Sequence, residues 1–380
     1  MDKVYDKCCG IDVHKKLIVA CFRKGSKQEL RNFGATTREL LELANWLQNG
    51  GCEMVAMEST ASYWKPLYNI LESSELKAMV VNASHMKAVP GRKTDTKDAE
   101  WIAELLQHGL LKASYIPDKQ QRELRELVRY RKSLVSERTR ELNRLQKMLE
   151  GANIKLSGTV SDINCMSARN ILEYLLTGEF FDEAKYDEMY KQKIIAHNLK
   201  ASKEQLIDDL NGVMTPLQRR MMKELLSHLD ELNVHINNLE DEIDNFMKPE
   251  EKQATQAIQD VTGIGKNSSQ AIISVIGTDM SRFPTAGHLA AWAGLCPGNN
   301  ESAQKRKTGK MRKGNALLRS TLVVCAHSAT RNKKFVLLCA VHENQFPPWK
   351  KTGLCCSCPF HAYSHLSHTQ GWSCFQRSGC

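Results

Sequence analysis

The sequence predicts an α/β domain at the N-terminus, a long helical region after it and a small helical domain near the C-terminus. Short apolar runs typical of strands alternate with helical patterns in the first part of the chain. Leucine-rich helical spacing dominates the middle, and glycine turns between short apolar helices follow it. The predicted segments are 1–115, 116–250, 251–334 and a distinct tail, 335–380.

Composition narrows the classes of protein that this chain can belong to. The 380 residues have a net charge of +10, which makes polyanions plausible partners. A mean hydropathy of −0.43 and the lack of a long apolar run exclude a transmembrane helix. The first residues lack the apolar segment of a signal peptide, so we expect a cytoplasmic protein whose 13 cysteines are reduced.

The α/β domain is predicted to follow the order strand, strand, strand, helix, strand, helix, strand, helix. A tight turn at His14 joins the first two strands, and His14 is expected to be a turn residue only. Glycines at 50 and 51 end the first helix. In chain order the expected elements are 8–13, 17–22, 31–33, 37–48, 53–57, 63–70, 77–81 and 95–108.

Two long helices are predicted in the middle of the chain. The first, 119–149, carries a leucine stripe and many basic residues, and the second, 225–246, carries a heptad seam with acidic residues outside it. This pattern indicates an antiparallel coiled-coil hairpin or a zipper between two subunits. The seam residues are Leu225, Leu229, Leu232, Ile236, Leu239, Ile243 and Phe246.

Positive charge is concentrated in two stretches. Residues 119–147 hold ten basic and four acidic side chains, a net of +6, and residues 301–334 hold ten and one, a net of +9. Two separate basic surfaces favour a nucleic-acid-binding protein. The alternative is that both are solvated surfaces without a partner.

Four carboxylates form the main candidate site. Asp12 lies in the first strand, Glu58 ends a later strand, and Asp95 and Asp98 lie three residues apart at a helix start. Oxygen ligands at one edge of a sheet suit Mg²⁺ or Mn²⁺, and two such ions can promote phosphoryl transfer. Taken singly, each residue could instead cap a turn or a helix.

A glycine turn, VTGIGK at 261–266, indicates a helix-hairpin-helix element. Gly263 and Gly265 would let backbone amides approach a phosphate, and Lys266 begins a helix whose N-terminus is positive. The alternative is an ordinary tight turn between two helices.

Three segments carry a resemblance to a known family: GIDVHK at 10–15, MESTASYW at 57–64 and KTDTKDA at 93–99. They resemble the DEDD transposases of bacterial insertion sequences, which have a RuvC-like, RNase H-like N-terminal domain. The resemblance extends over residues 1–331. It implies that the four carboxylates form a metal-binding catalytic tetrad.

The segment 299–315 resembles the C-terminal domain of the same transposases, in which a serine precedes a basic segment and a Gly-Asn pair. Without the resemblance, Ser302 would be a solvated loop residue. With it, Ser302 is implied to form a covalent link to DNA, and Gly314-Asn315 is the matching pair. The basic residues implied to neutralise DNA phosphates are Lys305, Arg306, Lys310, Arg312 and Lys313.

The resemblance implies a transposase that cuts and exchanges DNA strands with metal help. Its implied partners are the DNA of the element ends and target, a structured guide RNA, and further copies of the chain as a dimer or tetramer. We expect the complete site, which needs both Ser302 and the tetrad, to form between subunits. Two alternatives stay open: a metal-dependent junction nuclease that uses water, and an inactive DNA-binding remnant.

The tail has a different composition from the rest of the chain. Six of the 13 cysteines fall in residues 335–380, yet their spacing with nearby histidines fits no standard zinc-ligand pattern. A frameshift near Lys334 explains the change better, because codons can be chosen whose shifted frame reads as a basic stretch and a helix. We therefore expect a poorly ordered tail.

Overall fold

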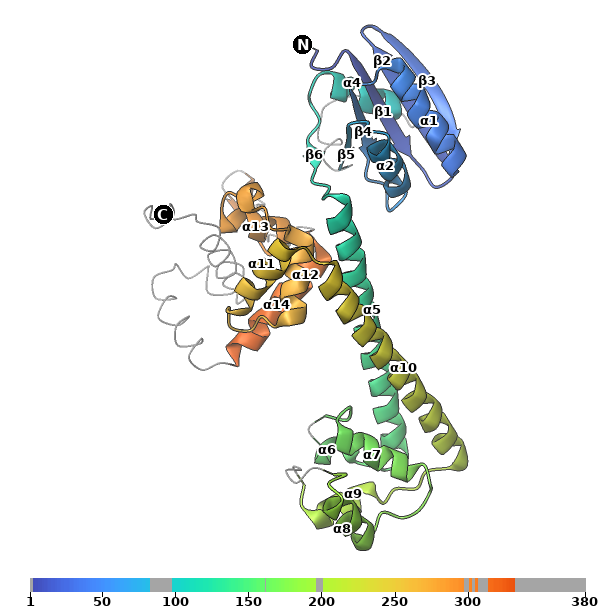
Figure 1. Ribbon diagram of the computed structural model, residues 1–380, viewed down its shortest axis with the longest axis vertical. Helices are drawn as coiled ribbons and strands as arrows, with labels where there is room; N and C mark the ends of the chain where they lie inside the picture. The colour runs from blue at the N-terminus through green and yellow to red at the C-terminus, as the bar shows by residue number, and fades with distance from the viewer. Residues whose placement is uncertain are drawn as a thin grey trace, which may run out of the picture. The chain divides into compact units, whose positions relative to one another are not determined.

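The computed structural model describes residues 3–82, 98–160, 162–195, 201–296 and 314–331, and the backbone of 301–302 and 305–306. The chain divides into two compact units, Met1–Pro117 and Asp118–Cys380 (Figure 1). Within the part described, no helix is long and apolar enough to cross a membrane. The predicted frameshift and the zinc alternative concern residues 335–380, which lie outside these ranges.

The first unit is built on a six-stranded mixed sheet with the order β3-β2-β1-β4-β5-β6. The strand β1 is antiparallel to β2 and parallel to β4, so the two central strands of the sheet run in the same direction. The strands are β1 (Lys7–Val13), β2 (Leu17–Lys24), β3 (Lys27–Gly34), β4 (Met54–Glu58), β5 (Ala78–Val81) and β6 (Ala113–Ser114).

Helices cover both faces of this sheet. On one face, α1 (Thr37–Gly50) and α2 (Trp64–Ser73) cover the odd-numbered apolar residues of the central strands, such as Ile11 and Met57. On the other face lies α4 (Asp98–Gln107). Coverage on both sides explains why six of the seven residues of β1 are buried and why the strand is predominantly apolar. The arrangement is consistent with an RNase H-like fold.

The predicted elements are present in the predicted order, with strand and helix ends shifted by a few residues. The third strand is longer than expected. Its polar residues show no strand pattern in the sequence, but backbone pairing with β2 keeps them extended. The two-residue strand β6 was not predicted, since so short a run has no periodicity.

The second unit is organised around two long helices, α5 (Lys119–Gly151) and α10 (Pro216–Phe246), which pack side by side. In the middle of the pair, Leu134 packs with Leu232, Ile236 and Leu239. The predicted packing of the apolar seam against the basic helix is therefore confirmed within one chain. Near its start, Leu226 is the more buried neighbour of the predicted Leu225.

A small helical cluster surrounds one end of this helix pair. It contains α6 (Leu156–Thr159), α7 (Met166–Leu175), α8 (Glu183–Lys191) and α9 (Lys203–Leu210), which share a core with the end of α5 and the start of α10. Residues 151–200 could not be assigned from the sequence, because these helices are short and lack a long apolar period.

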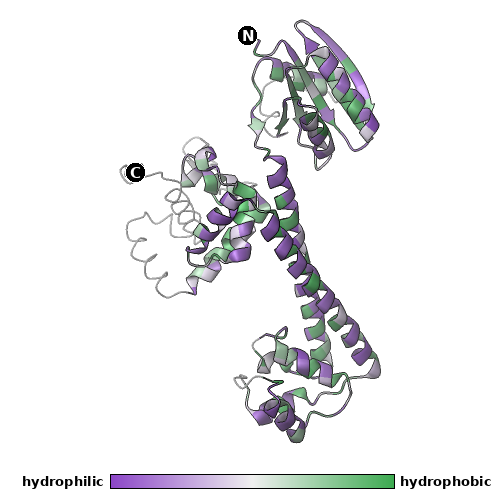
Figure 2. Ribbon diagram, viewed as in Figure 1, coloured by the Kyte–Doolittle hydropathy of each residue, from purple (hydrophilic) through white to green (hydrophobic). Residues whose placement is uncertain are grey.

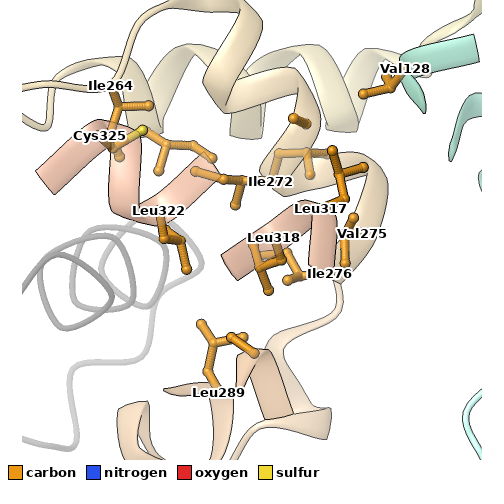
Figure 3. Close-up of a cluster of buried hydrophobic side chains, with 14 of the residues drawn as sticks. Val128, Ile264, Ile272, Val275, Ile276, Leu289, Leu317, Leu318, Leu322 and Cys325 are labelled. Atoms are coloured by element: carbon orange, nitrogen blue, oxygen red, sulfur yellow. The ribbon is translucent and has the colours of Figure 1, made fainter. Parts of the chain in front are cut away.

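A second cluster packs at the other end of the pair. Its helices are α11 (Pro249–Gln259), α12 (Lys266–Ile276), α13 (Ala286–Ala293) and α14 (Ala316–Thr330), with the short strands β7 (Glu301–Ser302) and β8 (Lys305–Arg306) between the last two. Figure 3 shows Leu318 and Leu322 of α14 beside Ile272 and Ile276 of α12, with Val128 of α5 at the edge. Figure 2 shows hydrophobic and hydrophilic residues mixed along these helices.

Candidate active site

The first part of the candidate site lies at the carboxyl ends of β1 and β4. The register pairs Ile11 with Met57, so Asp12 and Glu58 are the next residues along two neighbouring parallel strands. Because side chains alternate between faces, both carboxylates belong to the face opposite α1 and α2. Asp12 is only 6% exposed and Glu58 is half-buried. The sequence prediction that these two residues come from neighbouring strand ends agrees with this register.

The start of α4 lies at the same edge and on the same face. A Cβ atom on Gly10 would lie 2.5 Å from the carbonyl oxygen of Ala99 and 2.2 Å from the amide nitrogen of Ala103, so the helix packs directly on the backbone of β1. Later residues of α4 pack toward the beginning of β1 and β4. The helix therefore runs against the strand direction, and its first residue, Asp98, lies toward the end of β1 that carries Asp12.

His14 contacts the most buried of these carboxylates. Its Nε2 lies 2.9 Å from Oδ2 of Asp12, and its backbone amide donates to the carbonyl oxygen of Leu17, which closes the turn between β1 and β2. The expectation that His14 is a turn residue only is therefore wrong. The contact depends on the turn geometry, and the only signal in the sequence is that His14 follows Asp12 by two residues.

The donor chemistry of this edge fits a hard divalent cation. Asp12, Glu58 and Asp98 offer carboxylate oxygens, which Mg²⁺ and Mn²⁺ prefer. Among the residues that the structure describes, no three His, Cys, Asp or Glu side chains are grouped closely enough to hold a metal ion. The fourth predicted ligand, Asp95, falls in the segment 83–97, outside the described ranges.

Ser302 belongs to the second unit. Its backbone pairs with that of Lys305 in a two-stranded hairpin, and Glu301 pairs with Arg306. The remaining basic residues predicted to contact DNA in this segment lie outside the described residues: Lys310, Arg312 and Lys313.

The ends of the segment that carries Ser302 meet at one point. A Cβ atom on Gly314 would lie 2.3 Å from the amide nitrogen of Gly294 and 2.6 Å from the carbonyl oxygen of Ala293, so only glycine fits there. The next residue, Asn315, caps α14 by accepting a hydrogen bond from the amide of Leu318 at 3.1 Å. The Gly-Asn pair thus closes the base of the loop and starts the helix that follows it.

The glycine turn between α11 and α12 has a clear packing role. Gly263 has a φ of +90°, and a Cβ atom there would lie 2.5 Å from the carbonyl oxygen of Cys325 in α14. Gly265 precedes α12 and has open space around it. Lys266 forms an ion pair with Asp244 of α10. Packing explains the need for Gly263, and the ion pair explains the place of Lys266, without any contact to DNA. Of the three predicted phosphate-binding residues, Gly265 alone has open space beside it, as phosphate binding requires.

Some of the basic side chains of α5 form hydrogen bonds inside the second unit. Arg125 donates to the carbonyl oxygens of Ser274 and Val275 at the end of α12, where the helix dipole favours a cation. Burial lowers the pKa of Arg125 to about 10. Arg131, which is 4% exposed, donates to Gln270 at 2.6 Å. These arginines position α12 against α5, which the net charge of the helix did not indicate.

Comparison with known proteins gives two family matches. Residues 9–154 match the model of the DEDD transposases of the IS110 type, described as "Transposase". Residues 255–337 match a model described as "Transposase IS116/IS110/IS902 family". The first match includes all four predicted tetrad residues, and the second includes Ser302 and the pair Gly314-Asn315.

Two bacterial proteins are similar over most of the chain. One is the "Transposase for insertion sequence element IS1111A" of Coxiella burnetii, 23% identical over 286 residues, which are 75% of this chain and 67% of that protein. The other is the "Probable family 20 transposase" of Pseudomonas aeruginosa, 23% identical over 329 residues, which are 85% of this chain and 80% of that protein.

Proposed function

Because the chain belongs to the IS110 family of transposases, we propose that it moves an insertion sequence by cutting DNA through Ser302 and exchanging the strands with help from the tetrad. The observation that carries the proposal is the register of β1 and β4, which puts Asp12 and Glu58 on adjacent strand ends. The start of α4, with Asp98, lies at the same edge.

In this proposal Asp12, Glu58, Asp95 and Asp98 hold Mg²⁺ or Mn²⁺. When bound, the metal stabilises negative charge on the phosphate and promotes loss of the proton from the attacking hydroxyl. The contact from His14 holds Oδ2 of Asp12 and would orient this carboxylate for an ion. Burial of Asp12 keeps water from competing for that carboxylate.

Ser302 is the proposed nucleophile. Its Oγ attacks the phosphorus of a phosphodiester, the Oγ–P bond forms, and the bond from phosphorus to one deoxyribose oxygen breaks. The proton leaves the serine hydroxyl, and the departing oxygen takes up a proton. One phosphodiester replaces another, so attack by a hydroxyl of a second strand can reverse the step and rejoin DNA.

The wider assembly is also part of the proposal. DNA of the element ends and of the target is the substrate, a structured RNA guides target choice, and several copies of the chain act together. We further propose that α5 and α10 form a coiled coil and that the turn at 261–266 is a helix-hairpin-helix element.

A strand-cleavage assay on supercoiled or branched DNA with Mn²⁺ tests the central claim. Asp12→Asn and Glu58→Gln proteins are expected to lose cleavage while staying folded by circular dichroism. A Ser302→Ala protein is expected to lose both cleavage and the covalent protein–DNA adduct seen on denaturing gels. Cleavage by Ser302→Ala would favour the junction nuclease that uses water, and no cleavage by the unmodified chain would favour the inactive remnant.

A further inference from the structure

The structure separates the basic residues of α5 into two groups. Three arginines point into the second unit, where Arg125 binds the end of α12, Arg131 binds its first turns, and Arg138 donates to Asn233 of α10 at 3.0 Å. The guanidinium groups of these arginines form hydrogen bonds inside the unit. The basic residues that remain on the surface are therefore the ones available to an external partner.

Arg129, Arg140 and Lys147 are exposed and form what we call the outer basic face of α5. They are separated by eleven and seven residues, three and two turns of a helix, so they share one side. That side is opposite the seam that packs on α10, which includes Leu145 and Leu149. Along 18 residues the face extends for roughly 27 Å.

Little negative charge interrupts this face. Glu126 pairs with Arg129 at 3.3 Å, and Arg129 remains 45% exposed beside it. Between Arg129 and Arg140 the exposed positions on this side are the serines Ser133 and Ser136, whose short side chains leave room for a close approach.

The partner helix has the opposite charge. From residue 224 to the end of α10 there is no Lys or Arg. The carboxylates in this part of the helix are Glu224, Asp230, Glu231, Glu240, Asp241, Glu242 and Asp244. A polyanion is therefore attracted to α5 and repelled from α10, which selects one side of the helix pair.

The same helix, α5, also contacts the helix that follows the serine loop, through a residue beside the outer basic face. Lys132 of α5 donates a hydrogen bond to Oγ of Ser320 in α14. Since α14 begins at Ala316, directly after the segment that carries Ser302, this contact joins the helix of the outer basic face to the helix that follows that segment.

We propose that the outer basic face of α5 is a binding track for duplex DNA that leads toward the Ser302 loop. A straight helix with cations spread over roughly 27 Å suits a rigid duplex, whose helical turn is about 34 Å. The proposal rests on the proposed function, because a transposase must hold DNA beside its nucleophile. It adds the surface that does so.

The test compares two triple variants of the full chain that have the same change in charge. The first is Arg129→Gln, Arg140→Gln and Lys147→Gln on the outer basic face. The control is Lys191→Gln, Arg220→Gln and Lys223→Gln, three exposed cations on α8 and at the start of α10 that lie outside the outer basic face. Binding of a 30-base-pair duplex is measured by fluorescence anisotropy at several salt concentrations, in parallel with an RNA hairpin of similar length. The probe lengths are chosen to be about one to three helical turns.

We expect the first variant to bind the duplex about tenfold or more weakly at 0.1 M salt, with a salt dependence reduced by about 2–3 phosphate contacts. The control should bind like the unmodified chain. Equal losses in both variants, or an unchanged salt dependence in the first, would overturn the proposal. So would a loss of RNA binding alone, which would assign the face to RNA. If the unmodified chain binds no DNA, the proposed function itself fails, which is a separate result.

Discussion

Gly10 and Gly314 occupy positions where two stretches of backbone come too close for any side chain. Gly10 lets α4 lie directly on β1, and Gly314 lets the start of α14 meet the end of α13. Neither glycine needs a positive φ, so their importance comes from space alone. At Gly10 the space decides how near Asp98 can come to Asp12.

Replacing Gly10 by Ala should therefore lower the stability of the first unit and reduce DNA cleavage. The added methyl group would overlap the backbone of α4, and overpacking of this kind costs about 2–3 kcal/mol. Chemical denaturation followed by circular dichroism measures the change in the free energy of unfolding. Gly151→Ala is the control, because nothing lies within 4 Å of its Cβ position, and this protein should lose no stability. Equal stability of the two proteins would contradict the close packing of α4.

Because it contains buried thiols, the first unit should lose stability as the pH rises into the alkaline range. Burial raises the pKa of Cys8 and Cys21 to about 11, from an ordinary value of 9.0. Between pH 9 and 11 the unfolded thiols lose protons while the folded ones keep them, so the free energy of unfolding should fall as pH rises. Urea unfolding at pH 8 and pH 10.5 measures this fall.

The matched protein for this measurement is Cys21→Ala. With one thiol fewer, its stability should decline less steeply with pH than that of the unmodified chain. At pH 8 the thiols of Cys8 and Cys21 should also resist dithionitrobenzoate until denaturant is added, because the reactive form is the thiolate. An identical pH dependence in both proteins would refute the role of the Cys21 thiol.

The candidate carboxylates could be predicted from the sequence, but their environment could not. Asp12 and Glu58 follow apolar strand runs, so their place at strand ends is visible in the pattern. The contact between His14 and Asp12 depends on a turn, and the fit of Gly10 against α4 depends on two segments far apart in the chain. No local pattern records either contact.

Among the elements, the long helices were the most predictable and the short ones the least. The first helix, α5, begins at Lys119, as predicted, because Asp118 caps it by accepting from the amide of Gln121. The second, α10, begins at Pro216, nine residues before the predicted seam, because Thr215 and Gln218 form a capping box there. The helices between them are too short for periodicity to identify.

The seam between the long helices should contribute strongly to the stability of the second unit. Ile236 is 3% exposed and Val234 on the same helix is 56% exposed. We expect Ile236→Ala to lower the free energy of unfolding by about 2–4 kcal/mol, and Val234→Ala to change it by less than about 0.5 kcal/mol. Denaturant unfolding measures both. Similar small effects would mean that the seam is open in solution.

At the scale of the whole molecule, the proposed tetrad and the proposed nucleophile belong to different compact units. The sequence predicted an α/β part that ends at 115, followed by helical parts, and the first compact unit ends at Pro117. The helical region and the C-terminal helices form one unit, because α12 and α14 share their core with α5 and α10. Long-range packing of this kind leaves no trace in the local sequence.

Separation into units makes complementation between copies a direct test of a shared site. A mixture of Asp12→Ala and Ser302→Ala proteins should recover part of the strand exchange that each lacks alone, since some assemblies would combine one intact tetrad with one intact serine. Exchange is measured with a labelled DNA substrate. Mixing Asp12→Ala with Glu58→Ala is the control and should recover nothing, because the two residues belong to the same tetrad. No recovery in the first mixture would place both groups in one chain.

The contact between Gly294 and Gly314 has a consequence for how the sequence of this protein can evolve. The helices on either side of the serine loop are already joined at its base, so the core they form is insensitive to the loop's length. Each doubling of such a loop costs only about 0.6 kcal/mol in closure entropy. The segment can therefore vary in length and sequence around Ser302 while the helices at its base stay packed, so selection can alter how the protein binds DNA without loss of the fold.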